Sequence, residues 1–142
     1  MVRINIHRKK SGEICGIEVS GHSGYASAGN DIVCAGVSSL VFTALNSLIE
    51  LGQYTDEELA VDIQKGYTSF HIPEKSIEEQ TYIASIIRET TRIGFEQISE
   101  SYPKNVFSEM VNLKKHEHNM ANVVQEEQDY VSRVNYARRI DF

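Results

Sequence analysis

Two residues able to do chemistry, His22 and Cys34, flank a stretch of small residues in the first quarter of the sequence. A strand-like run ends at Gly21 and a helical pattern begins just after Asp31, so Cys34 is expected in the first turn of a helix. The unpaired N–H groups and the positive dipole at a helix N-terminus favour a thiolate, and a nearby imidazole supplies a base. This pair is the minimum equipment of a cysteine hydrolase.

Neighbouring residues are assigned supporting roles. Asp31 is predicted to be the helix N-cap, with orientation of His22 or shaping of the loop as its alternative role. Ser38 lies one helical turn beyond Cys34, where its hydroxyl bonds either the thiolate or the Cys34 carbonyl. The free amide of Cys34 and those of Gly29 and Asn30 are expected to stabilise an oxyanion.

The loop between the two residues, 22–30, is rich in glycine, alanine and serine. Gly24, Gly29 and Asn30 belong to it and are expected to shape it or contact a ligand. This composition suits a segment that moves or packs closely over a substrate.

Hydrophobic periodicity predicts the elements that position this loop. The predicted strands are residues 2–8, 13–21, 59–64, 67–72 and 106–111, with a tight turn at Lys65-Gly66. A first helix is predicted between Asp31 and Gly52. A second begins with a Ser76–Glu79 capping box and is expected to present one face to the core. That face comprises Ile83, Ile86, Ile87, Thr90 and Gly94.

The order β-β-α-β-β-α-β predicts an α+β fold with two helices packed on one sheet. This domain is assigned to residues 1–111. Residues 112–142 are predicted to be a separate C-terminal extension, either a docked or partner-binding helix or a partly ordered tail.

Charge and composition exclude several classes of function. The net charge is −6, and residues 1–111 hold 9 Lys/Arg against 15 Asp/Glu, so direct nucleic-acid binding is not expected. No apolar run is judged long enough to span a bilayer and no signal sequence is recognised, so we expect no membrane partner and a cytoplasmic location.

The second cysteine, Cys15, lies among apolar residues and is predicted to be a buried core residue. A disulfide with Cys34 is disfavoured in a reducing compartment. His116 and His118 lack a third ligand nearby, so neither a metal nor any other cofactor is expected.

Several segments together resemble the ribosomal-processing cysteine protease family, Prp, over about residues 1–110. The matching segments are Gly21-His22, Gly29-Asn30-Asp31-Ile32-Val33-Cys34-Ala35 and Ser38. Position 23 is Ser where the family usually has Ala, an exchange expected to preserve the turn. The 112–142 extension is not typical of the family.

The resemblance implies that Cys34 is the nucleophile and His22 its base, with Gly21, Asp31 and Ser38 in supporting roles. It also implies a homodimer with a mobile loop. The implied substrate is the N-terminal extension of large-subunit ribosomal protein twenty-seven, cut after an aromatic pair and before a small residue.

Two other hypotheses stay open from the sequence. One is a non-catalytic ribosome-associated factor that clamps a peptide with the same loop, for which an acidic core suits a basic protein tail. The other is a thiol redox sensor, which requires Cys15 to approach Cys34.

Overall fold

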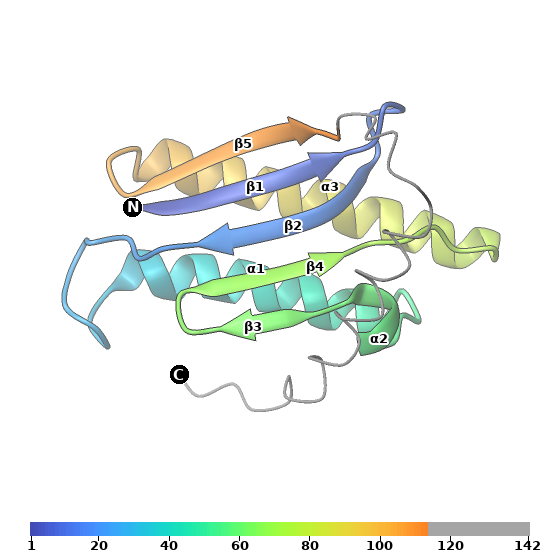
Figure 1. Ribbon diagram of the computed structural model, residues 1–142, viewed down its shortest axis with the longest axis horizontal. Helices are drawn as coiled ribbons and strands as arrows, with labels where there is room; N and C mark the ends of the chain where they lie inside the picture. Colours follow the sequence, from blue (N-terminus) through green and yellow to red (C-terminus); the bar gives the residue numbers. More distant parts are fainter. Residues whose placement is uncertain (114–142) are drawn as a thin grey trace, which may run out of the picture.

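The computed structural model describes residues 1–113, which form a five-stranded mixed sheet with helices on one face (Figure 1). The predictions for residues 114–142, which include the His116–His118 pair and most of the extension, concern residues outside the described part of the chain. The strands are β1 (Val2–Arg8), β2 (Ile14–Ser20), β3 (Asp62–Gln64), β4 (Tyr67–His71) and β5 (Val106–Asn112).

The sheet order is β3-β4-β2-β1-β5. Strand β1 pairs antiparallel with β2 and parallel with β5, and β4 pairs antiparallel with both β2 and β3. The predicted α+β class and element order are confirmed, with one addition: a one-turn helix, α2 (Asp56–Leu59), precedes β3. The Thr55 side chain caps this helix, and a capping residue of this kind is a local signal that hydrophobic periodicity does not show.

Helix α1 (Ile32–Glu50) packs against the sheet behind β2 and β4 (Figure 1). An 18-residue window of this 19-residue helix has a mean hydropathy of 1.9, enough by length and composition to cross a membrane, so the expectation that no run is this apolar is wrong. The apolar face of α1 nevertheless packs in the hydrophobic core of the protein. Its buried side chains are Val33, Val37, Val41, Ala44, Leu45 and Leu48.

Helix α3 (Glu78–Ser101) lies beside α1 on the same face of the sheet (Figure 1). Its N-cap is Ile77, which makes no side-chain capping bond, so the predicted Ser76–Glu79 capping box is wrong. The predicted inward face is only partly right: Ile87 packs against the core and Gly94 faces Leu40, whereas Ile86 is 48% exposed. The buried residues are Ala84, Arg88, Thr91 and Phe95.

Arg88 is a charged residue on the buried face of α3. The Arg88 guanidinium is 3% exposed, and it forms an ion pair with Glu13 at 2.9 Å and donates to the Ile72 carbonyl at 3.3 Å. These partners allow a charged side chain to occupy the inner face of α3, which hydrophobic periodicity does not predict.

Three connections meet at one end of the sheet (Figure 1). They are the 22–30 loop after β2, the β3–β4 turn at Lys65-Gly66, and the α3–β5 turn at residues 102–105. Hydrogen bonds join them: Gly21 N–H donates to the Gly66 carbonyl at 2.9 Å, and Asn105 bonds Ser23. This end of the sheet therefore positions the candidate site.

Candidate active site

Cys34 lies in the first turn of α1 and is half-buried, as predicted. The Asp31 side chain caps the helix, because its Oδ1 accepts hydrogen bonds from the N–H groups of Val33 at 3.0 Å and Cys34 at 2.9 Å. The Cys34 amide is therefore occupied, and the expectation that it is free for an oxyanion is wrong in this conformation. The Asn30 amide is occupied too, by the Ser27 carbonyl at 3.0 Å.

The sulfur of Cys34 accepts a hydrogen bond from another backbone amide, that of Ser23, at 3.3 Å. The Ser23 hydroxyl donates to Asp31 Oδ2 and accepts from the Tyr25 amide at 3.2 Å. Ser23 is 3% exposed. The exchange treated as mild from sequence thus places a buried serine at the centre of the site.

Asp31 shapes the loop, which was one of its predicted alternatives. The Ser23 hydroxyl, followed by the amides of Cys34, Ala26 and Val33, lowers the pKa of Asp31 from 3.8 to about 2. These four donors use both carboxylate oxygens. Within residues 1–113, no hydrogen bond from His22 to this carboxylate is found, so the other alternative, orientation of His22, has no support.

His22 is positioned by two glycines. Gly21 has φ +90°, and a Cβ there would collide with the Met1 carbonyl oxygen, so only glycine fits this bend. Gly66 has φ +71°, and a Cβ there would lie 3.0 Å from His22 Nε2. The imidazole therefore rests directly on the β3–β4 turn.

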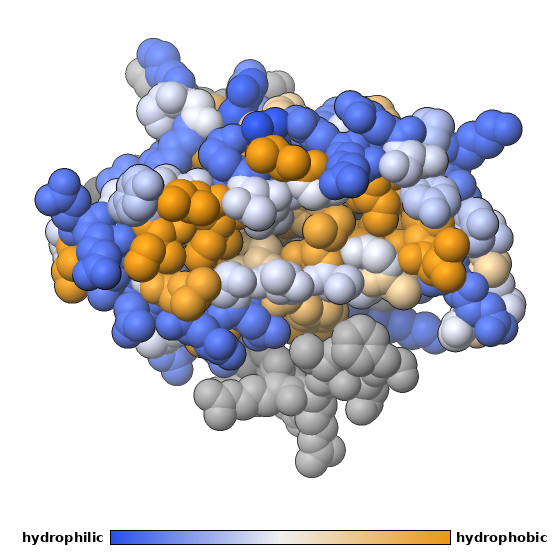
Figure 2. Space-filling view, turned by 180° about the vertical axis from the view of Figure 1, so that it is seen from behind, coloured by the Kyte–Doolittle hydropathy of each residue, from blue (hydrophilic) through white to orange (hydrophobic). Residues whose placement is uncertain are grey.

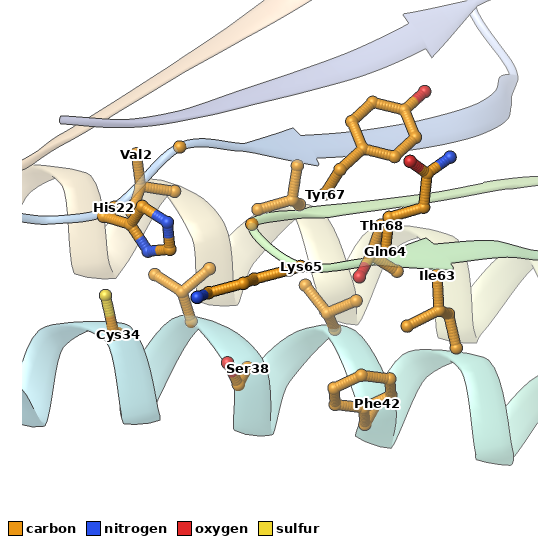
Figure 3. Close-up of a pocket in the computed structure, with 15 residues that line it drawn as sticks. Val2, His22, Cys34, Ser38, Phe42, Ile63, Gln64, Lys65, Tyr67 and Thr68 are labelled. Carbon is orange, nitrogen blue, oxygen red and sulfur yellow. The ribbon is translucent and has the colours of Figure 1, made fainter. Parts of the chain in front are cut away.

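A groove of about 460 Å³ runs between α1 and the β3–β4 hairpin. His22 and Cys34 lie at one end of it, one above the other, with the ring and the sulfur facing each other (Figure 3). The Ser38 hydroxyl points into the same space, while Phe42 and Ile63 line the far end. The structure thus brings three of the predicted residues together.

Gly24 and Gly29 are exposed turn positions of the loop, with φ +68° and +84°. Asn30 is exposed as well, and its side-chain amide donates to the Ser27 hydroxyl at 3.2 Å. None of these three residues lines the groove in this conformation. Their observed role is to shape the loop.

Lys65 is a groove residue to which sequence reasoning assigned only a turn. Its side chain runs along the groove from the β3–β4 turn toward His22 and Cys34 (Figure 3). In the part of the chain that the structure describes, no carboxylate forms an ion pair with it. The ammonium group therefore brings a positive charge to the end of the groove that holds His22 and Cys34.

Cys15 is 1% exposed, its thiol donates to the His7 carbonyl at 3.6 Å, and burial raises its pKa. It is near the start of β2, and the strand carries the chain about 17 Å from there to Ser20. A disulfide needs Cα atoms within about 7 Å. Cys15 lies at the end of β2 opposite the 22–30 loop, whereas Cys34 is in the first turn of α1 directly after that loop (Figure 1), so the redox-sensor hypothesis fails on geometry.

The arrangement of Cys34, His22 and the groove supports acyl transfer through sulfur. A half-buried thiol accepts one fixed N–H donor, faces an imidazole, and opens onto an elongated groove. Among residues 1–113, no three His, Cys, Asp or Glu side chains are grouped to hold a metal ion.

Comparisons with known proteins agree with this chemistry. Residues 1–107 match the family described as cysteine protease Prp. The ribosomal processing cysteine protease Prp of Bacillus subtilis is 32% identical over 106 residues, which cover 75% of this chain and 94% of that protein. The Staphylococcus aureus protein of the same name is 28% identical over 106 residues, covering 75% and 95%.

A solved structure has the same fold. It is the S. aureus ribosomal processing protease Prp in complex with a covalently linked product peptide, with a TM-score of 0.64 and 24% identity. The match covers 78% of this chain and 100% of that one.

Proposed function

This chain belongs to the cysteine protease Prp family, and from that premise we propose that it is an endopeptidase with Cys34 as nucleophile and His22 as base. The observation that carries the assignment is that the thiol and the imidazole face each other at the same end of the groove between α1 and the β3–β4 hairpin. The competing hypothesis of a non-catalytic peptide clamp is not carried further, because the family is one of proteases.

The proposed reaction has two acyl-transfer steps. Deprotonated Cys34 Sγ attacks the scissile carbonyl carbon, the C–N bond breaks, and protonated His22 gives its proton to the leaving amine. Neutral His22 then takes a proton from water as the water oxygen attacks the thioester. The carboxylate product leaves and the thiol is restored.

The Ser23 N–H is the proposed oxyanion donor. It already lies 3.3 Å from the attacking sulfur, so an oxygen on the carbon that sulfur attacks would form within its reach. The amides of Cys34 and Asn30, which the sequence favoured for this role, have other acceptors. The Lys65 ammonium supplies a positive charge at the end of the groove that holds Cys34.

The proposed substrate is the N-terminal extension of large-subunit ribosomal protein twenty-seven, or a related ribosomal or phage protein. Three observations support a peptide of this kind. The curated relatives are named ribosomal processing proteases, and the S. aureus enzyme has also been crystallised with a substrate peptide. The far end of the groove has apolar walls at Phe42 and Ile63. The acidic balance of residues 1–111 favours a basic protein as partner.

Mass spectrometry of the substrate tests this function. The full chain is incubated with ribosomal protein twenty-seven carrying its N-terminal extension, and in parallel with the protein lacking it. A single shortened N-terminus after an aromatic pair, appearing only with the extended protein, supports the assignment. Intact extended protein after prolonged incubation, or equal cleavage by Cys34→Ala, refutes it.

We also propose that the protein is a cytoplasmic homodimer. The helix side of the molecule carries exposed apolar residues that suit a subunit contact (Figure 2). On α3 they are Tyr82, Ile86 and Ile93. Sedimentation velocity at micromolar concentration distinguishes a dimer from a monomer, and Ile86→Lys is expected to shift the protein toward monomer.

A further inference from the structure

Two contacts fasten the 22–30 loop to the α3–β5 turn. The Asn105 side-chain amide donates to the Ser23 carbonyl at 2.9 Å, across 82 positions of sequence. The rings of Tyr25 and Tyr102 meet edge to face, with centroids 5.7 Å apart. Both contacts come from the same short turn, so one connection outside the groove holds the loop at two points.

Asn105 is itself held by its backbone. Its N–H donates to the Tyr102 carbonyl at 2.9 Å, and its carbonyl accepts from the Val2 amide at 2.8 Å. Strand β1 and the end of α3 therefore fix the position from which the side chain reaches the loop. A change of the side chain alone leaves these backbone bonds in place.

Ser23 uses every polar group it has. Its N–H faces the Cys34 sulfur, its hydroxyl bonds Asp31, and its carbonyl is the acceptor for Asn105. Because Ser23 directly follows His22, any displacement of this residue moves the imidazole and removes the N–H from sulfur together. The rest of the loop is exposed, and its bonds to Ser27 and Asp31 are local in sequence, whereas Asn105 ties the loop to a distant turn.

We propose that Asn105 is a positioning residue for the protease reaction, acting through the Ser23 carbonyl, and that the Tyr25–Tyr102 ring pair is a second tether of the same loop. The inference rests on the proposed roles of Cys34 and His22. Asn105 does not touch the groove and is not among its lining residues. Its effect is to keep the loop assembled, so it contributes to turnover rather than to substrate affinity.

The first test uses Asn105→Asp, which keeps the shape of the side chain and removes its N–H donors. Its control is Lys104→Ala, an exposed neighbour on the same turn. A quenched fluorescent peptide with an aromatic pair followed by alanine reports turnover. Loss of the hydrogen bond, together with repulsion between the ionised Asp carboxylate and the Ser23 carbonyl oxygen, is expected to lower kcat by at least about five- to tenfold, with KM and the melting temperature nearly unchanged.

The second test needs no substrate. Amide hydrogen exchange of the peptide that covers residues 22–30 is expected to be about five- to tenfold faster in Asn105→Asp than in the wild type or Lys104→Ala. Unchanged exchange in a folded variant overturns the proposal, as does a kcat within twofold of wild type. Loss of the proposed catalytic function itself is recognised separately, by a Cys34→Ala variant that still cleaves.

The ring tether is tested at Tyr25, which is 49% exposed and outside the core. Tyr25→Phe keeps the ring contact and is expected to match wild type within twofold. Tyr25→Ala removes it and is expected to lower kcat about three- to tenfold and to speed loop exchange. Because Tyr25 lies outside the core, this pair tests the ring tether independently of Asn105. If Asn105→Asp fails to fold, Asn105→Ala replaces it in the test of the Ser23 contact. Equal behaviour of the two Tyr25 variants refutes the tether.

Discussion

The Ser23 amide donates a hydrogen bond to the Cys34 sulfur at 3.3 Å. This bond closes the 22–30 loop on itself, since one partner precedes the loop body and the other follows it on α1. Because Ser23 is bonded to the sulfur and directly follows His22, the bond also places His22 near the sulfur. The spacing of eleven residues between His22 and Cys34, which has no meaning in a helix or strand, acquires its meaning from this single contact.

Removing either proposed catalytic side chain is expected to stop cleavage without unfolding the protein. Cys34→Ala deletes the nucleophile, and His22→Ala deletes an acid–base group worth about 10²–10⁴-fold in rate. Neither change opens a large cavity, because Cys34 is half-buried and His22 is exposed. Peptide turnover and thermal melting are measured together. A folded Cys34→Ala protein that cuts at the wild-type rate would end the assignment.

The two cysteines are expected to differ in reactivity with iodoacetamide. Cys34 opens onto the groove, whereas Cys15 is 1% exposed and burial raises its pKa. Alkylation of Cys34 should be more than about tenfold faster in the native protein, because the reagent reaches Cys15 only through local unfolding. Peptide mapping by mass spectrometry gives both rates. Urea-unfolded protein is the control, and equal rates in the native state would contradict the site.

Gly66→Ala is expected to reduce activity more than its effect on stability explains. The new methyl group would lie 3.0 Å from His22 Nε2 and displace the ring. The matched control is Gly12→Ala, where φ is +89° and nothing lies within 4 Å of the new methyl group. Both variants carry a left-handed strain of roughly 1–2 kcal/mol.

Only Gly66→Ala should lose an additional factor of about 10–100 in kcat, the scale of a small misplacement of a catalytic group. Melting curves check the shared strain and peptide assays check the difference. If Gly12→Ala loses as much activity as Gly66→Ala, strain alone explains both results and the contact with His22 is irrelevant.

Acid is expected to weaken the loop through Asp31. Its pKa is lowered from 3.8 to about 2, so its stabilising contribution is complete above about pH 5 and is lost as the pH falls through about 2. Asp31→Asn should therefore melt below wild type at neutral pH, and the difference should shrink between pH 4 and pH 2. Glu109→Gln, at an exposed carboxylate of β5, serves as the control. A difference that is constant with pH contradicts the ionised cap.

A chain ending after residue 113 is expected to keep the protease activity. The family match ends at residue 107, and the B. subtilis relative is covered over 94% of its length by this match. The relatives thus carry their named activity with little beyond the matched domain. Peptide turnover by the shortened and the full chain should agree within about threefold, about 0.6 kcal/mol in barrier height. Loss of peptide cleavage on shortening would assign the extension a direct part in the reaction.

Sequence predicted the parts of the site whose physics is local. A helix N-cap and a hydrophobic repeat are each decided by a few neighbouring residues, so the Asp31 cap and α1 were found. His22 and Cys34 were found because their residue types and the start of a helix together indicate a chemistry. The fold class followed from the order of the elements.

Sequence did not predict what distant segments contribute. Asn105 reaches Ser23 across 82 positions, and nothing near Asn105 in the chain signals that contact. Lys65 and Gly66 were assigned correctly to a turn, but the groove beside that turn exists only once β4 pairs with β2. The inner face of α3 was predicted only in part, because Arg88 is buried there and hydrophobic periodicity does not signal its ion pair with Glu13.

The Met1 carbonyl touches the bend at Gly21, and Val2 lines the groove. A purification tag fused ahead of Met1 would therefore emerge beside the reactive sulfur. Such a fusion offers the enzyme a tethered peptide at high local concentration, so kinetic constants from amino-terminally tagged protein would report self-competition along with turnover.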